Sequence, residues 1–177
     1  MSDASSRIGV LFVCHANICR SPLAEAVFVH LARTRGVGGR FDVDSAGTWG
    51  IDGARPHERS IEVARQHGVD LRPFDRVARG LEPRDLERFD HLLVMDRRNL
   101  ADLERLRRIS AFGRVEQNEA RIRLLQHVVD PSRTGAAADV DDPVSGGPAD
   151  FQRAYETIER GCTALLDELL ASAGSPI

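Results

Sequence analysis

One short segment limits what this chain can fold into more than any other: an apolar run followed by the turn sequence C-H-A-N-I-C-R-S-P. The run from Ile8 to Val13 is almost continuously apolar, which is typical of a strand buried on both faces of a parallel sheet. Ser21 and Pro22 predict the N-cap and first turn of a helix that stops at Gly36. The chain is therefore predicted to begin with a strand, a tight loop and a helix.

Strand and helix patterns then alternate to the end of the chain. Further strands are predicted at Phe41 to Ser45, His91 to Met95 and Ile122 to Leu125. Helices are predicted from Glu58 to Gln66, along the stripe Leu100, Leu103, Leu106 and Ile109, and along Phe151, Tyr155, Ile158, Cys162, Leu165 and Leu169. This alternation predicts an α/β fold in three layers, with a four-stranded parallel sheet and helices on both faces. Residues 126–148 read as a long surface loop.

Length and composition suit a single soluble domain spanning residues 1–177, with residues 1–6 and 173–177 expected to be flexible. The net charge is −3, and acidic residues and arginines are interspersed, so no nucleic-acid partner is expected. No apolar run is long enough to span a membrane, and the N-terminus lacks the apolar core of a signal peptide. We therefore expect no membrane partner and a cytoplasmic location.

Two residue types limit the chemistry further. The chain contains no lysine, which excludes a Walker-type nucleotide loop and Schiff-base chemistry. It has three cysteines, an odd number that argues against a structural disulfide framework. His15, His57 and His67 do not have the spacing of metal ligands. Neither a metal nor a cofactor is expected.

The turn after the first strand has the residues that a phosphoryl-transferring thiol needs. A cysteine attacks as the thiolate, which requires positive potential around its sulfur. For Cys14 this potential would come from inward N–H groups of the loop, from Arg20, and from the N-terminus of the following helix. The same groups would bind a phosphate dianion, because arginine's planar fork matches two phosphate oxygens. The turn thus predicts a phosphate-binding loop that contains its own nucleophile.

Phosphoryl transfer also needs an acid for the leaving oxygen and a base to activate water. One carboxyl group can serve both steps in turn. The predicted long loop offers four aspartates, Asp130, Asp139, Asp141 and Asp142. Two of them, Asp130 and Asp142, precede a proline that would stiffen the backbone. Composition does not choose between the four, and any loop aspartate can be a turn former.

Four segments together resemble the low molecular weight protein-tyrosine phosphatases: V-C-H-A-N-I-C-R-S-P at 13–22, S-A-G-T-W at 45–49, V-M-D-R-R-N-L at 94–100 and D-D-P-V-S-G-G-P-A-D-F at 141–151. The resemblance covers residues 8–170 and implies the family's flavodoxin-like sheet. It implies that Cys14 forms a phosphocysteine intermediate, that Arg20 clamps the transition state and that Asp142 is the acid and then the base. The phosphate would lie against His15, Ala16, Asn17, Ile18, Cys19 and Arg20.

The resemblance also assigns supporting roles. Ser21 would donate a hydrogen bond to the thiolate, and Asn17 and Ser45 would brace the loop together with it. Trp49 and Val144 would form the wall of the substrate slot, although a core position is the alternative for Trp49. Cys19 would be the redox partner that protects Cys14 through a reversible disulfide. Cys162 is expected to be a packing residue of the last helix.

The chain departs from the family pattern at several positions. Ala16 stands where glycine is usual, and Asp141 stands where proline is common. Val144 and Ser145 replace tyrosines found in many relatives, which leaves substrate preference open. The expected substrate is a phosphotyrosine-bearing protein, with tyrosine kinases among the candidates, and the expected state is a monomer.

Three other functions are alternatives to tyrosine phosphatase activity. A protein-arginine phosphatase is the nearest, but Ile18 occupies a place where such relatives tend to carry threonine. An arsenate reductase of this fold needs two further cysteines in the middle of the chain, whereas no cysteine lies between Cys19 and Cys162. A non-catalytic phosphate-binding module would be expected to lack the nucleophile, the clamp or the acid.

Overall fold

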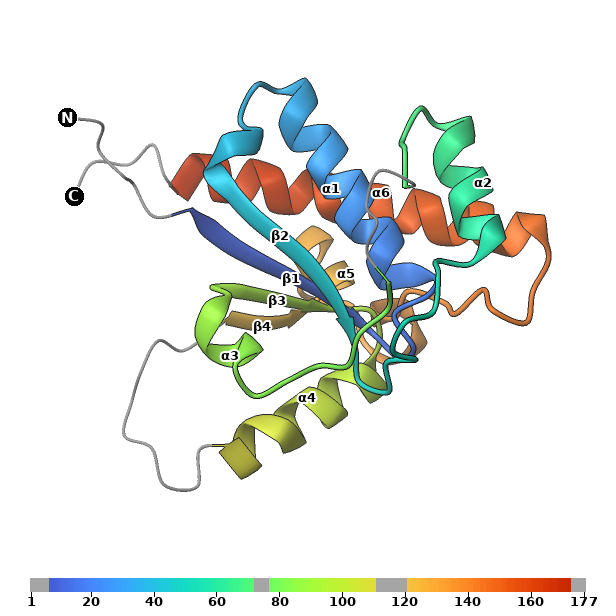
Figure 1. The fold of residues 1–177 in the computed structure, drawn as a ribbon. Helices are drawn as coiled ribbons and strands as arrows, with labels where there is room; N and C mark the ends of the chain where they lie inside the picture. The colour runs from blue at the N-terminus through green and yellow to red at the C-terminus, as the bar shows by residue number, and fades with distance from the viewer. Residues whose placement is uncertain (1–6, 72–76, 111–120, 173–177) are drawn as a thin grey trace.

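A four-stranded parallel sheet forms the middle of the computed structural model, which describes residues 7–71, 77–110 and 121–172 (Figure 1). The strands are β1 (Ile8–Cys14), β2 (Phe41–Gly47), β3 (His91–Val94) and β4 (Arg121–Leu124), in the order β2-β1-β3-β4. In register, Cys14 at the end of β1 lies beside Gly47 at the end of β2, and Val13 lies beside Val94 of β3. The carboxyl ends of the strands therefore share one edge of the sheet.

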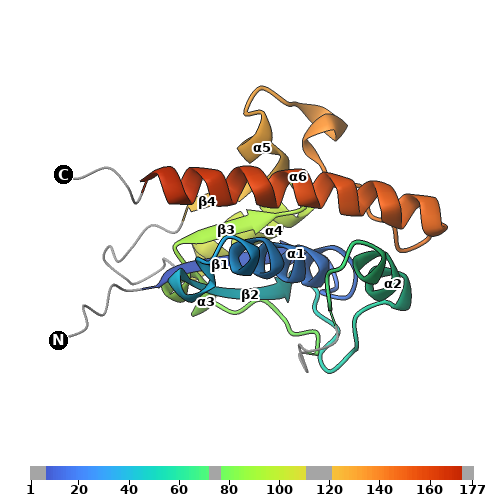
Figure 2. The same cartoon turned by 90° about the horizontal axis from the view of Figure 1, so that it is seen from above.

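Helices cover both faces of this sheet. The helices are α1 (Arg20–Thr34), α2 (Glu58–Gln66), α3 (Asp85–Arg88), α4 (Arg97–Ser110), α5 (Leu125–Val129) and α6 (Pro148–Ser172), with short 3₁₀ turns η1 (Gly38–Arg40) and η2 (Gly135–Ala138). Figure 1 shows α1 and α6 on one face and α3 and α4 on the other, and Figure 2 shows α6 running across the molecule beside α1. The predicted three-layer α/β fold is confirmed.

The alternation of side chains along β1 explains why its sequence is apolar throughout. Val10 and Phe12 pack on the face covered by α1, where Phe12 contacts Phe28 with ring centroids 5.8 Å apart. Leu11 and Val13 pack on the opposite face with Leu103 of α4. A strand with helices on both sides has no face left for polar residues. Each large apolar side chain buried in this way contributes about 1.5–3 kcal/mol to folding.

Two predictions about local structure were wrong. Ser21 is not the N-cap of α1, because the helix begins at Arg20 and Cys19 is the cap residue, without a capping side-chain bond. The Ser21 hydroxyl instead contacts Cys14 and Asn17 of the loop that precedes α1. The predicted loop at 126–148 contains α5 and η2, which are too short to show a helical repeat in sequence. The flexibility expected for residues 1–6 and 173–177 lies outside the described residues.

None of the helices in the described part of the chain is long and apolar enough to cross a membrane.

Candidate active site

The loop from Cys14 to Arg20 lies at the carboxyl edge of the sheet, between β1 and α1. Its carbonyl groups point toward the segment that follows β2. Thr48 N donates to Cys14 O at 2.9 Å, Trp49 N to His15 O at 2.8 Å, and Ile51 N to Ala16 O at 3.3 Å. In a trans peptide the N–H points opposite to the C=O. The N–H groups of residues 15, 16 and 17 therefore point to the other side, into the loop.

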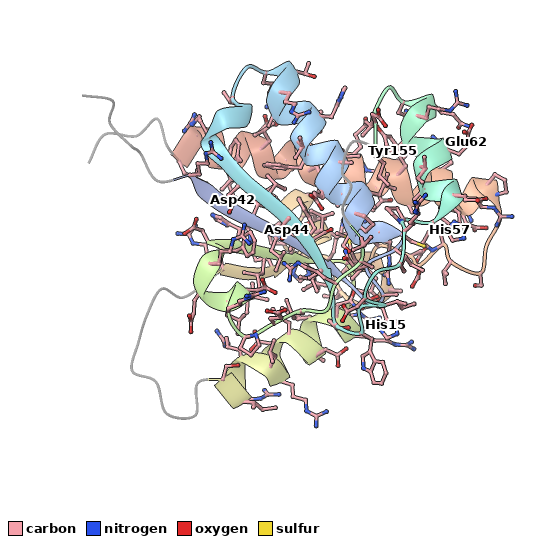
Figure 3. The ribbon with its side chains drawn as sticks, in the orientation of Figure 1. His15, Asp42, Asp44, His57, Glu62 and Tyr155 are labelled. Carbon is pink, nitrogen blue, oxygen red and sulfur yellow. The ribbon has the colours of Figure 1, made fainter. Side chains whose placement is uncertain are left out.

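This arrangement forms a concave set of donors at the N-terminus of a helix. His57 N at the start of α2 donates to Ile18 O at 2.7 Å, which turns the N–H of Cys19 inward in the same way. Figure 3 shows His15 at this edge of the sheet and His57 near the start of α2. Inward N–H groups and the positive end of a 15-residue helix favour an anion at the centre of the loop.

Cys14 lies at the bottom of this loop and is almost fully buried, with 3% of its surface exposed. Its Sγ is 3.0 Å from Ser21 Oγ. Asn17 Nδ2 donates to the same hydroxyl at 2.8 Å, so the hydroxyl proton of Ser21 is free to point to the sulfur or to Ala46 O, 3.2 Å away.

Asn17 joins the loop to three neighbouring segments through its side-chain amide. It is the non-glycine residue in the described ranges with a positive φ, 59°, a conformation that asparagine tolerates better than most residues. Its Nδ2 also donates to Ser45 Oγ at 3.0 Å, and Ser45 Oγ donates to Glu25 Oε2 at 2.7 Å. Its Oδ1 accepts from Arg79 N at 3.0 Å. Each donor and acceptor of the amide is thus used to hold one strained turn.

Arg20 is buried at the opening of α1, and its guanidinium joins three segments. Nη1 donates to Asp96 Oδ2 at 2.7 Å and to Val140 O at 2.9 Å, and Nη2 donates to Asp142 Oδ2 at 2.8 Å. Burial lowers the pKa of this guanidinium, but neighbouring acidic groups, led by Cys14, outweigh burial and raise it. The guanidinium of arginine stays charged even when it is buried, so it is well suited to stabilise phosphate oxygens.

The four candidate aspartates occupy different places. Asp142 contacts Arg20, and its Oδ1 accepts from Val144 N at 3.2 Å. Asp139 accepts hydrogen bonds from Arg97 at the start of α4. Asp130 bonds with Ser132, whose hydrogen bonds lower the pKa of the Asp130 carboxyl. Asp141 is exposed. Asp142 is the one of the four that contacts Arg20 in the described structure.

The rim of the site is apolar and open. Trp49 follows β2, and 76% of its surface is exposed, which rules out the alternative that it is a core residue. Its backbone N–H donates to His15 O, so the main chain at Trp49 lies beside the loop of residues 14–20. Val144 is 48% exposed, two residues after Asp142. Both positions suit walls that contact a flat substrate group.

The three cysteines are free thiols. Cys19 is buried, and burial, followed by the charges of Asp142 and Cys14, raises its pKa to about 12. Cys162 is fully buried in α6, where burial raises the pKa of its thiol well above the usual range. Among the described residues, no group of three His, Cys, Asp or Glu side chains is placed to hold a metal ion.

Sequence reasoning missed three residues that the fold brings to the site. Asp96 follows β3 and bonds to both Arg20 and Asn99 N, the latter at 2.8 Å. Glu25 lies in α1 behind Ser45, and Arg79 supplies a backbone donor to Asn17. Asp96 had a detectable signal, because it directly follows a buried strand at the carboxyl edge. The other two had none.

The sequence of this chain is similar to those of known phosphatases. A family model described as low molecular weight phosphotyrosine protein phosphatase matches residues 9–174. The chain is 38% identical over 160 residues to the low molecular weight phosphotyrosine protein phosphatase of Homo sapiens, covering 90% of this chain and 94% of the human protein. It is 40% identical over 163 residues to the low molecular weight protein-tyrosine-phosphatase YfkJ of Bacillus subtilis, covering 90% and 94%.

Solved structures agree with this assignment. The crystal structure of YfkJ from Bacillus subtilis superposes with a TM-score of 0.80 at 36% identity and covers 96% of this chain and 99% of YfkJ. The crystal structure of a drosophila arginine phosphatase superposes with a TM-score of 0.76 at 31% identity and covers 90% and 96%. With a loop built around Cys14 and Arg20 at the expected edge of the sheet, the chain belongs to the low molecular weight phosphotyrosine protein phosphatase family.

Proposed function

We propose that this protein is a protein-tyrosine phosphatase that hydrolyses phosphotyrosine through a phosphocysteine at Cys14, without a metal or cofactor. One observation carries the assignment of roles. The guanidinium of Arg20 lies at the N-terminus of α1 and contacts Asp142, while Cys14 is 3.0 Å from Ser21 below the same loop. Nucleophile, clamp and acid therefore come together from segments about 120 residues apart.

Substrate binding would change the contacts of Arg20. A phosphate dianion in the loop competes with Asp142 for Nη2, because the guanidinium fork prefers two oxygens of one phosphate. Nη1 can keep its bond to Asp96, which holds the guanidinium plane in place. Asp142 would then be released from Arg20 and be near the leaving oxygen. Phosphate binding and acid release would be coupled through one side chain.

The first chemical step would form the S–P bond of Cys14 and break the P–O bond to tyrosine. The protonated carboxyl of Asp142 would give its proton to the departing phenolate, and Arg20 would follow the equatorial oxygens. In the second step the Asp142 carboxylate would take a proton from water, whose oxygen attacks phosphorus. The thiolate of Cys14 would leave as inorganic phosphate forms, and the Ser21 hydroxyl would donate to it.

The substrate slot supports an aromatic ester. Exposed Trp49 stands beside the phosphate loop, and Ile18 is partly buried against the core. A flat phenyl ring can stack against an indole, and the planar guanidinium of phosphoarginine can do so too. Phosphoarginine is therefore the second candidate substrate, supported by the likeness to the drosophila arginine phosphatase. We further propose a cytoplasmic, monomeric enzyme that acts on phosphoproteins, with tyrosine kinases among its candidates.

The test of this function is hydrolysis of p-nitrophenyl phosphate by the wild type and by Cys14→Ser and Asp142→Ala, in reducing buffer with a chelator. We expect Cys14→Ser to be inactive and Asp142→Ala to lose about 10²- to 10⁴-fold in kcat. A phosphotyrosine peptide should be hydrolysed with a higher kcat/KM than a phosphoarginine peptide. An inverted preference would favour arginine phosphatase, and an inactive reduced, folded wild type would contradict the phosphatase assignment.

A further inference from the structure

The segment 139–147, here called the acid loop, carries Asp142 and is attached to the core by the buried side chains of Val140 and Pro143. Asp141, Asp142 and Val144 are all exposed. A cavity of about 420 Å³ lies between this loop, η2 and α6, and its lining includes Asp139, Asp142 and Pro143. In the structure the Asp142 carboxylate is held by Arg20, and once phosphate takes its place there, no other buried side chain of the described residues is seen to hold the carboxylate. Its position depends on how the loop is attached at its ends.

The start of the acid loop is attached to α4 by one side-chain pair. Asp139 Oδ1 accepts from the Arg97 backbone N at 3.0 Å and from Nε at 3.1 Å. Asp139 Oδ2 accepts from Nε at 3.1 Å and from Nη2 at 2.9 Å. A carboxylate that receives both a helix N-terminal N–H and a guanidinium fork is held in direction as well as in distance.

This attachment lies close to the reacting groups along the chain. Arg97 directly follows Asp96, which holds Arg20, and Asp139 precedes Asp142 by three residues. Val140, between them, donates through its N to Met95 O at 2.7 Å and accepts from Arg20 Nη1 at 2.9 Å. The hydrogen bonds of Val140 use only its backbone atoms, and its side chain is buried in the core. The Arg97–Asp139 pair adds an attachment made by side chains, which substitution of either residue would remove or weaken.

We propose that the Arg97–Asp139 ion pair is a positioning device for Asp142, and that it sets how well the acid reaches the leaving oxygen. The proposal rests on the proposed function of Asp142. A general acid must come within about 2.6–3.2 Å of the oxygen it protonates, and a misplacement of about 1 Å can cost on the order of 100-fold. Arg97 is about half exposed, so the pair is open to screening by salt.

The pair predicts a specific kinetic pattern. Weakening it should slow the release of poor leaving groups, which need the proton, and spare good leaving groups, which depart without one. We expect Asp139→Ala and Arg97→Met to lower kcat/KM for phenyl phosphate by about three- to tenfold, and for p-nitrophenyl phosphate by less than about twofold. Asp139→Ala should have the larger effect, because Arg97→Met keeps the backbone N–H bond.

The matched control is Arg88→Ala. Arg88 forms a surface ion pair with Asp42 at 3.0 Å, and its side chain is as exposed as that of Arg97, at 53%. The control should leave the leaving-group dependence unchanged. Thermal melting of each variant will show whether it is folded, and kcat/KM of the wild type in about 1 M NaCl should move toward that of Arg97→Met.

Repeating Asp139→Ala in an Asp142→Ala background separates this inference from the function that it rests on. With the acid absent, the pair should have nothing to position, and no further leaving-group dependence should appear. Equal losses on both substrates, or no loss in either folded variant, would overturn the positioning role. If Asp142→Ala itself shows no leaving-group dependence, the assignment of the acid fails instead.

Discussion

At the scale of single residues, the site depends on side chains that each serve more than one partner. Asn17 uses both protons of its amide and its oxygen to join Ser21, Ser45 and the backbone of Arg79. The chain of donors continues to the buried carboxylate of Glu25, which accepts the hydroxyl proton of Ser45. An amide whose donors and acceptor are all bonded in this way is held rigidly. The phosphate loop is therefore shaped before substrate arrives.

The environment of Cys19 predicts how a redox pair with Cys14 would behave. Cys14 would be oxidised first to the sulfenic acid by peroxide, with loss of water. The Cys19 thiolate would then attack that sulfur, releasing hydroxide and closing a disulfide. Because the pKa of Cys19 is raised to about 12, its thiolate fraction should grow about tenfold per pH unit between pH 7 and 9.

The measurement is the recovery of phosphatase activity by dithiothreitol after a short peroxide treatment, with peptide mass spectrometry of the 14–19 bond. We expect the wild type to recover and Cys19→Ser to stay inactive, because its sulfenic acid is oxidised further. Cys162→Ser, which removes a thiol buried in α6, is the control and should recover like the wild type. Equal recovery of Cys19→Ser would argue against the redox pair.

At the scale of elements, the contact between α5 and α6 holds the region that precedes the acid loop. Leu125 begins α5 and is fully buried. It packs against Gly161 of α6, where an added Cβ would meet Leu125 Cγ at 2.6 Å. A glycine in the middle of a 25-residue helix lowers the stability of the helix, so its presence there needs a reason in the packing. Here the side chain of Leu125 fills the space that a larger residue at 161 would need.

Gly161→Ala should therefore destabilise the protein although alanine is the better helix former. Alanine gains about 1 kcal/mol of helix propensity, and overpacking of a buried site costs about 1–3 kcal/mol. We expect a net loss of about 1 kcal/mol in the free energy of unfolding, measured by chemical denaturation.

The matched control is Gly39→Ala, where an added Cβ meets nothing within 4 Å. That change should be neutral or slightly stabilising. A Gly161→Ala variant as stable as the wild type would show that Leu125 repacks without cost.

At the scale of the whole molecule, the end of the sheet opposite the active site holds a buried histidine whose protonation affects folding. His91 begins β3, at the opposite end of the strand from Asp96. Burial, followed by the charges of Arg123 and Arg121, lowers the pKa of His91 below its ordinary 6.5, although Asp90 and Glu168 act in the other direction. Its Nδ1 is buried without a hydrogen-bond partner among the described residues.

A lowered histidine pKa makes folding depend on pH in one direction. The folded state binds this proton less well than the unfolded chain, so the stability is fully present above about pH 6.5 and is lost as pH falls below it. We expect the thermal midpoint of the wild type to fall more between pH 7.5 and 5.5 than that of His91→Leu. Parallel curves for the two proteins would mean that His91 does not contribute.

The sequence was sufficient for much of the fold and for the reacting loop. An uninterrupted apolar strand, a Cys and Arg six positions apart, and a helix start after them are local patterns, and local patterns follow from the geometry of strands and helices. They placed Cys14 and Arg20 at the carboxyl edge. They failed at Ser21, whose hydroxyl serves the sulfur instead of the helix end, and at α5 and η2, which are too short for periodicity.

The remaining features depend on contacts between residues far apart in the chain. Nothing in the local pattern chose Asp142 over Asp130, Asp139 and Asp141; the family resemblance pointed to it, and contact with Arg20 across 122 residues supports it. The partners Asp96 and Arg79 lie 76 and 62 residues from the groups they hold. Such pairs are fixed by the order of strands and the packing of helices on the sheet, which bring chain segments together without leaving a repeat in the sequence.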